Sequence, residues 1–255
     1  MLNFLTQDAV IRRAGLRLVM VQGLPSPWTQ AAKTIFEIKK LDYAVAPWAA
    51  GEANQPIAEW AHTDSAPVVA WNDEPPITRW LDILFLAERL APAPSLVPSN
   101  AHERALMLGL AHELCGELGI GWNRRLQMFA PMLDTGTAPP SIQVMGQRYR
   151  YNRDDATRAG ERTAGQLRAL TAQLKAQAAR GVNYFIGDQL SALDIYWVVF
   201  ANLLDPLPKA QCPIPDEMRP MFPATDPQIT AALDPILFAH RDRIFQQYFR
   251  SPMEF

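Results

Sequence analysis

A serine at the expected start of the first helix could take part in chemistry. Residues 24–28 read Leu-Pro-Ser-Pro-Trp, and Ser26 stands between a predicted strand and a predicted helix. Backbone N–H groups at a helix start stabilise a nearby anion, so a hydroxyl here can help to hold a negatively charged ligand atom. The alternative is structural. Serine before proline is also a common helix start, with Ser26 as the N-cap and Pro27 in the first turn.

The segment Ser65-Ala66-Pro67 is a second candidate, because it opens a predicted strand at residues 68–71. Proline is the residue at which a cis peptide bond is energetically accessible, and such a bond tends to occur in a specific turn. An ordinary trans proline at the start of a strand would have the same sequence. The sequence leaves both conformations open.

The histidines do not predict a metal site, because none of the four shows a spacing such as His-Glu-x-x-His. Cys115 and Cys212 are too far apart in sequence for a metal motif, and so few cysteines favour a reducing compartment. Cys115 also lies in an apolar helical pattern and is interpreted as a small core residue. Residues 122–125, Trp-Asn-Arg-Arg, either give a helix end its positive charge or face a substrate cleft.

Short apolar segments alternate with helical patterns in the first third of the chain, which predicts an α/β layered structure. The predicted strands cover residues 16–21, 43–46 and 68–71, and the predicted helices residues 31–38, 56–62 and 77–90.

A Pro-rich linker at residues 91–98 follows, and strand signals nearly vanish beyond it. Helices are predicted at residues 101–118, 154–180, 192–204 and 235–249. The third of these is so apolar that it must lie at the centre of its domain. Two segments, residues 131–151 and 206–223, show no clear period and are predicted to be long loops.

Bulk composition limits the partners. The chain has 255 residues, of which 49% are hydrophobic, so it can form one large core or two small ones. A net charge of −2 gives no reason to expect a nucleic-acid or anionic-membrane partner. No apolar run is long enough to span a membrane, and the N-terminal segment lacks the continuous apolar core of a signal peptide.

Residues 185–195 read Phe-Ile-Gly-Asp-Gln-Leu-Ser-Ala-Leu-Asp-Ile and mark the start of the apolar helix. Ser191 and Asp194 have capping-box spacing, with aspartate in place of the more usual glutamate. Leu190 and Ile195 fit the hydrophobic staple around this box. The motif is a folding signal and carries no chemistry of its own.

Three segments, residues 24–28, 65–69 and 185–195, together resemble the glutathione transferase superfamily. The first looks like the opening motif of its serine-type members, with tau- and omega-like character. The resemblance covers most of the chain. It implies a thioredoxin-like, glutathione-binding α/β domain with a short N-terminal extension at residues 1–92. An all-helical bundle domain with a hydrophobic substrate pocket would follow at residues 98–255.

The resemblance further implies an enzyme that activates the thiol of glutathione, its cosubstrate, for attack on a hydrophobic electrophile without a metal. Ser26 would stabilise the thiolate. A thiol with a pKa near 8.5 becomes nucleophilic at neutral pH if that pKa falls by ~2 units, which needs roughly 2.7 kcal/mol. The other glutathione contacts that the resemblance implies are Trp28, Ser65, Ala66, Pro67, Thr78 and Arg79.

One position departs from the family pattern. At the start of the helix predicted at residues 77–90, family members carry an acidic residue followed by serine, which receive the ammonium and carboxylate of glutathione. Thr78-Arg79 or, one residue later, Arg79-Trp80 stands there instead. Thr78 can still cap the helix, but Arg79 would repel an ammonium and favour a carboxylate. The alternative is therefore a non-catalytic binding or interaction protein with the same fold.

The resemblance also implies a cytoplasmic homodimer that acts in detoxification, with no nucleic-acid or membrane partner. A redox activity is disfavoured, because serine occupies the position where redox classes carry cysteine and no Cys-x-x-Cys occurs.

Overall fold

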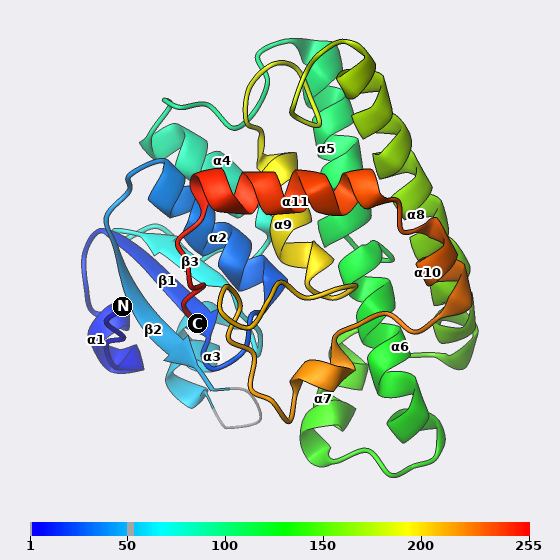
Figure 1. The fold of residues 1–255 in the computed structure, drawn as a ribbon. Helices are drawn as coiled ribbons and strands as arrows, with labels where there is room; N and C mark the ends of the chain where they lie inside the picture. The colour runs from blue at the N-terminus through cyan, green and yellow to red at the C-terminus, as the bar shows by residue number, and fades with distance from the viewer. Residues whose placement is uncertain (1, 50–53) are drawn as a thin grey trace. The chain divides into compact units, whose positions relative to one another are not determined.

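The computed structural model describes residues 2–49 and 54–255, which form two compact units (Figure 1). Unit 1 comprises Met1–Leu96, Leu207–Pro215 and Tyr248–Phe255, and unit 2 comprises Val97–Pro206 and Asp216–Gln247. Two late segments of the chain therefore belong to the N-terminal unit, so the units are not the two continuous ranges, 1–92 and 98–255, that the sequence suggests.

Unit 1 is built on a small mixed sheet with the strand order β2-β1-β3. Strand β1 pairs in parallel with β2 and antiparallel with β3. Ile77 adds an isolated antiparallel bridge to Val69 on the far side of β3. The strands are β1 (Leu16–Val21), β2 (Tyr43–Trp48) and β3 (Val68–Trp71), so the predicted strands are confirmed, with β2 two residues longer than expected.

Within the described residues 2–49 and 54–96, the helices beside this sheet are α1 (Gln7–Ile11), α2 (Pro27–Ile38), α3 (Gln55–Ala61) and α4 (Trp80–Leu90). The predicted helix at residues 77–90 begins three residues late, because the backbone of Ile77 is hydrogen-bonded to Val69 in the sheet. Helix α1 was not predicted. It is short, and its start is fixed by Thr6, whose hydroxyl accepts the N–H of Ala9 at 3.2 Å.

A buried lysine holds the Pro-rich linker against unit 1. Lys39 is 3% exposed, and its ammonium donates to the carbonyls of Ala91 and Pro94 at 2.6 and 2.7 Å. The same ammonium pairs with the Glu88 carboxylate at 2.8 Å. That carboxylate also accepts the N–H of Leu96 at 2.9 Å. The first residues of the linker are thus fixed in place, since a buried charge requires these partners.

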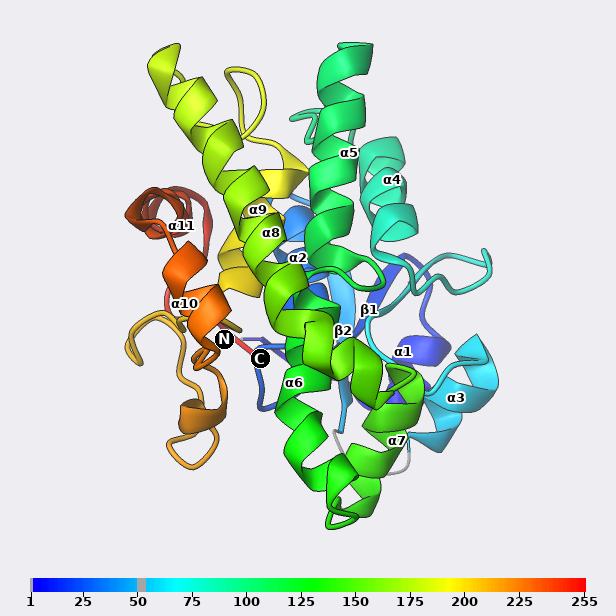
Figure 2. The same ribbon diagram turned by 90° about the vertical axis from the view of Figure 1, so that its right-hand side faces the viewer.

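Unit 2 is helical in the residues that the structure describes (Figure 2). The longest helix, α8, runs beside α6 and α10, and α9 packs against α5. The segment predicted as a loop at residues 131–151 contains the end of α6 and a further helix, α7, so that prediction is wrong. The elements are α5 (Ala101–Cys115), α6 (Ile120–Asp134), α7 (Pro140–Arg148), α8 (Arg153–Ala179), α9 (Ala192–Ala201), the 3-10 turn η1 (Arg219–Met221), α10 (Pro227–Ala232) and α11 (Pro235–Tyr248).

Helix α9 forms the centre of unit 2, as its sequence predicts. All ten of its residues are buried, and the capping box formed by Ser191 and Asp194 is present. This confirms the predicted folding signal. Trp197, near the middle of the helix, is fully buried and donates its indole N–H to the carbonyl of Leu237 in α11 at 2.8 Å.

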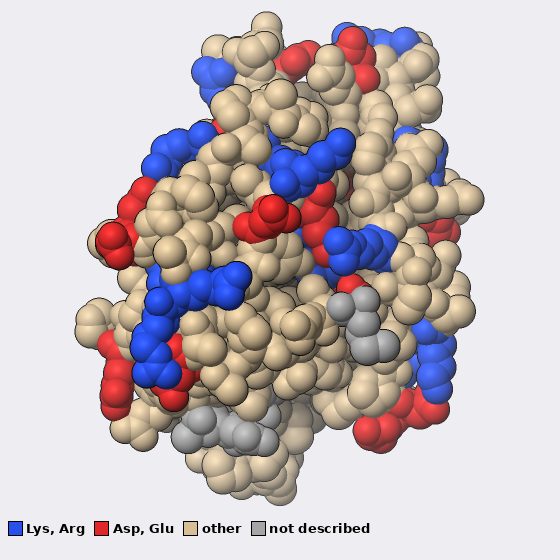
Figure 3. All heavy atoms as spheres, turned by 90° about the vertical axis from the view of Figure 1, so that its left-hand side faces the viewer, with Lys and Arg blue, Asp and Glu red and all other residues tan. Residues whose placement is uncertain are grey.

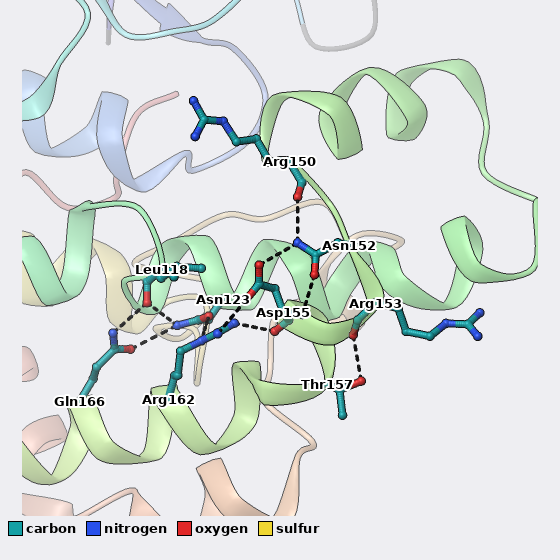
Figure 4. A network of polar contacts seen from close by, with 9 residues as sticks. All are labelled: Leu118, Asn123, Arg150, Asn152, Arg153, Asp155, Thr157, Arg162 and Gln166. Atoms are coloured by element: carbon teal, nitrogen blue, oxygen red, sulfur yellow. Dashed lines mark hydrogen bonds and ion pairs between the residues drawn. The ribbon is translucent and has the colours of Figure 1, made fainter.

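A polar network ties α6 to α8 (Figure 4). The guanidinium of Arg162 donates to Asn123 at 3.1 Å and to the Asp155 carboxylate at 2.9 Å. The amides of Asn123 and Gln166 both donate to the carbonyl of Leu118, in the turn between α5 and α6, at 2.6 and 2.9 Å. These contacts satisfy polar side chains along the helix interface.

Charge is spread over the surface. On the face drawn in Figure 3, Lys and Arg side chains lie among Asp and Glu side chains and do not gather into a large patch of one sign. None of the described helices combines the length and the apolar character that a membrane span requires.

Candidate active site at the end of the sheet

Ser26 lies at the junction between β1 and α2. It occupies the N-cap position of α2, with Pro27 in the first turn, as predicted. Its carbonyl accepts the N–H of Gln30 at 2.9 Å and the hydroxyl of Thr29 at 3.0 Å. Its own side chain makes no capping hydrogen bond. The half-buried hydroxyl therefore does not perform the structural role that the sequence offered as an alternative.

The sheet register brings the second candidate segment to the same end. Val19 in β1 pairs with Val68, the first residue of β3. Because these strands are antiparallel, Pro67, just before β3, lies beside the end of β1 that leads to Ser26. The Ala66–Pro67 peptide is cis, as the resemblance implies, and Pro67 is buried. Ser65 is half-buried, and its N–H donates to the hydroxyl of Thr63 at 3.2 Å.

The start of α4 approaches this end as well. The strand pair between Val69 and Ile77 is antiparallel, so the residues after Ile77 run back alongside Val68 and Pro67. Arg79 is the N-cap of α4 and is exposed. The prediction that Thr78 caps this helix is wrong, because the cap position lies one residue later. The sequence allowed either Thr78-Arg79 or Arg79-Trp80 at the position where the family carries its acidic residue and serine. With Arg79 as the N-cap and Trp80 as the first helical residue, the observed start of α4 matches the second pair.

Trp28 lies one residue into α2 and is half-buried, as are Ala66 and Thr78. The fold thus places every predicted site residue on three segments that meet at one end of the unit 1 sheet. These segments are the β1–α2 junction, the approach to β3 and the start of α4. An anionic sulfur could be held here by the first N–H groups of α2 and by the Ser26 hydroxyl.

Comparison with known proteins rests on structure alone. No protein-family model matches the chain, and no curated protein has a matching sequence. Among solved structures, rice GST1 in complex with glutathione is similar over 94% of each chain, with a TM-score of 0.60 and 18% identity. The β-etherase LigF from Sphingobium sp. strain SYK-6 is similar over 91% of this chain and 95% of its own, with a TM-score of 0.63 and 15% identity.

The chain has the fold of the glutathione transferases. A Methylobacillus flagellatus glutathione S-transferase with glutathione bound agrees, with a TM-score of 0.61 and 12% identity over 91% of this chain and 96% of its own. This confirms the predicted fold class, a thioredoxin-like α/β domain followed by a helical domain. Within this glutathione transferase fold, Ser26 and Pro67 belong to the thioredoxin-like part.

The residues at 122–125 have two different roles in the helical part of the glutathione transferase fold. Asn123 and Arg124 are structural. The guanidinium of Arg124 donates to the carbonyls of Leu203 at 2.8 Å and Phe222 at 3.3 Å, and burial lowers its pKa to about 10. Trp122 and Arg125 are only half-buried. The sequence could not show which of these four residues have a structural role, because that depends on the neighbours that each side chain contacts in the folded chain.

Asp194 makes contacts that its motif did not reveal. It is fully buried and accepts from the N–H of Phe185 at 2.9 Å and from Nε2 of His240 at 2.9 Å. On the other ring edge, His240 Nδ1 lies 2.8 Å from the guanidinium of Arg243. Because arginine can only donate, Nδ1 must accept, and the ring proton is on Nε2. The cluster is therefore a satisfied structural network at the start of α9.

Cys115 is not poised for reaction. Cys115 and Cys212 are both buried and are not joined in a disulfide, and burial raises the pKa of the Cys115 thiol well above its usual value. A raised pKa keeps a thiol protonated and unreactive. Among the described residues, no group of three or more His, Cys, Asp or Glu side chains is placed to hold a metal ion.

Proposed function

We propose that this protein is a glutathione transferase-type enzyme. It binds glutathione at the end of the unit 1 sheet and activates the thiol for attack on a hydrophobic electrophile. The observation that carries the proposal is the Ser26 hydroxyl, which stands at the start of α2 and makes no capping bond. Neighbours of the same fold, from rice and from Methylobacillus flagellatus, were solved with glutathione bound.

Each predicted residue has a role in this proposal. The Ser26 hydroxyl donates a hydrogen bond to the glutathione thiolate, and such a bond favours the charged form of the sulfur and lowers its pKa. Backbone groups of Ser65, Ala66 and Pro67 hold the cysteinyl part of glutathione, with Trp28 alongside. Thr78 and Arg79 face the γ-glutamyl end. The electrophile binds in an apolar pocket that the helical domain supplies.

A second candidate is a non-catalytic binding protein with the same fold, and Arg79 is the observation that favours it. At the cap of α4, this guanidinium replaces the carboxylate that would pair with the ammonium of glutathione. Glutathione affinity should therefore be lower than with an acidic residue. Replacing Arg79 by glutamate tests this point, and we expect it to tighten glutathione binding by a few-fold to tenfold.

The deciding experiment compares the unsubstituted protein with Ser26→Ala. Glutathione binding is measured by calorimetry, the pKa of the bound thiol by thiolate absorbance, and turnover with chlorodinitrobenzene. We expect Ser26→Ala to raise the thiol pKa and reduce turnover at least tenfold, with binding largely retained. Thermal stability should not change, because no capping bond is lost. Ser141→Ala, at an exposed serine in unit 2, is the control.

The results separate the two candidates. Equal turnover and equal thiol pKa in Ser26→Ala and the unsubstituted protein would exclude the enzymatic role of Ser26. Binding of glutathione without any turnover would favour the binding protein. If glutathione does not bind even to Arg79→Glu, the transferase proposal fails and a binding protein for a different ligand is favoured.

We also propose that the protein is a cytoplasmic homodimer that acts in detoxification. A surface groove of about 720 Å³ runs between α5 and α8, and the side chain of Leu106 on its wall is 37% exposed. Exposed leucine beside an open groove suits a subunit contact. Light scattering at micromolar concentration should give the mass of a dimer, and Leu106→Glu should shift it toward the monomer.

A further inference from the structure

The first turn of α2 lacks the support that an N-cap side chain usually gives. Ser26 occupies the N-cap position, but its hydroxyl makes no capping bond. The first N–H groups of a helix have no partner within the helix, and helix ends open easily when nothing else holds them. A hydroxyl that serves a ligand therefore needs other groups to hold the turn that carries it.

Two fully buried residues, Thr29 and Gln30, hold this turn. The Thr29 hydroxyl donates to the carbonyl of Ser26 at 3.0 Å, and the backbone N–H of Gln30 donates to the same carbonyl at 2.9 Å. The side-chain amide of Gln30 donates in turn to the carbonyl of Glu254 at 3.0 Å. Gln30 thus connects the start of α2 to a residue 224 positions later in the chain.

The segment Tyr248–Phe255, which belongs to unit 1, lies along α2 (Figure 1). The guanidinium of Arg250 pairs with the carboxylate of Glu37, in the last turn of α2, at 3.3 Å. Glu254 meets Gln30 near the start of the same helix. The segment therefore runs antiparallel to α2 and touches it near both of its ends.

This segment also has an attachment that does not involve α2. The N–H of Met253 donates to the carbonyl of Gln211 at 2.7 Å, and the Met253 side chain is buried. Residue 254 is therefore held in place by its neighbour. It can serve as a fixed point against which Gln30 sets the start of α2.

The other atom of the Gln30 amide indicates that stability alone does not explain this residue. Its Oε1 is buried and accepts no hydrogen bond within the part of the chain that the structure describes. A buried acceptor without a donor lowers stability, and an apolar side chain of similar length would avoid that cost. What the amide provides is its donor, which makes the link to Glu254.

We propose that Gln30 is a positioning residue for Ser26, and that the 248–255 segment holds the start of α2 through it. The proposal rests on the proposed role of Ser26 toward glutathione. Gln30 acts through Ser26 rather than on the ligand. It fixes the Ser26 backbone, and with it the direction from which the hydroxyl approaches the sulfur. The strength of that hydrogen bond depends steeply on distance and angle.

The test replaces Gln30 by methionine, which keeps the length of the side chain and removes the amide. We expect turnover of chlorodinitrobenzene to fall about threefold to tenfold, while KM for glutathione changes less than about twofold. The pKa of the bound thiol should rise, because the hydrogen bond to its charged form weakens. The melting temperature should not fall, since the unpaired Oε1 is removed as well. A merely structural role would lower the melting temperature and leave the thiol pKa unchanged.

Further variants show whether Gln30 acts through Ser26. Adding Gln30→Met to Ser26→Ala should cause no further loss of turnover, because the group that Gln30 positions is already absent. A chain that ends at Met253 lacks the acceptor on Glu254 and should behave like Gln30→Met. Gln173→Met is the matched control, since that amide donates to the Phe185 carbonyl at 2.6 Å within unit 2. It should leave turnover and thiol pKa unchanged.

Hydrogen exchange tests the positioning without any need for catalysis. The N–H of residue 30, whose acceptor is the Ser26 carbonyl, should exchange about threefold to tenfold faster in Gln30→Met than in the unsubstituted protein. If the unsubstituted protein shows no turnover, the transferase proposal fails, and faster exchange still supports the positioning of Ser26. Unchanged exchange overturns the positioning, whatever the turnover.

Two kinetic outcomes would also overturn the proposal. One is a normal thiol pKa together with normal turnover in Gln30→Met. The other is a loss of turnover in the double variant equal to the sum of the two single losses, expressed as free energies. Circular dichroism checks that each variant is folded. If Gln30→Met does not fold, the same measurements on the chain that ends at Met253 decide.

Discussion

Replacing Asp194 by alanine should destabilise the protein by about 3–5 kcal/mol. Loss of the cap on Ser191 contributes ~1 kcal/mol. The carboxylate also accepts the N–H of Phe185 and Nε2–H of His240 in a site with no exposure to water. Each of these buried donors, left without an acceptor, costs about 1–3 kcal/mol. The lower ends of these values sum to ~3 kcal/mol, and breaking a buried polar network costs a similar amount.

The measurement is urea unfolding followed by circular dichroism. Asp226→Ala is the matched control, because half-buried Asp226 caps α10 and accepts one further hydrogen bond, from the Gln127 amide at 2.8 Å, so its loss should cost about 1–2 kcal/mol. Asp194→Asn keeps one acceptor oxygen and should fall between the two. If Asp194→Ala costs no more than Asp226→Ala, the contacts with Phe185 and His240 contribute nothing, and the reasoning is refuted.

Two further matched pairs test the packing. Lys39→Ala should lower stability by about 3–5 kcal/mol, because the Glu88 carboxylate would lose its buried ion-pair partner. Lys40 is exposed, so Lys40→Ala should change stability by less than ~0.5 kcal/mol. Equal effects of the two substitutions in urea unfolding would contradict the anchoring of the linker by Lys39. Gly160→Ala should destabilise by about 1–3 kcal/mol, since its new Cβ would lie 2.1 Å from Asp226 Oδ2. Gly165→Ala in the same helix has open space and should stabilise by about 0.5–1 kcal/mol, so thermal melting should shift in opposite directions for the two variants.

Local signals in the sequence determined much of the fold. Short apolar runs predicted β1 and β3 at their observed bounds, and the spacing of Ser191 and Asp194 predicted the capping box of α9. These features depend only on residues within one turn or one strand, so they can be predicted from a short segment of the sequence. Helix α7 was missed, because Pro139, Pro140 and Gly146 weaken its pattern and only Gly146 among its residues is buried.

Tertiary structure decided what depends on distant neighbours. The sequence named Ser26, Pro67 and Arg79 separately, and only the strand register shows that their segments meet at one end of the sheet. It also could not show whether the Ser26 hydroxyl caps its helix, since that depends on the local backbone geometry. The acceptor of the His240 ring lies 46 residues away in Asp194. Such contacts follow from how helices pack, and packing is a property of the folded chain rather than of any short segment.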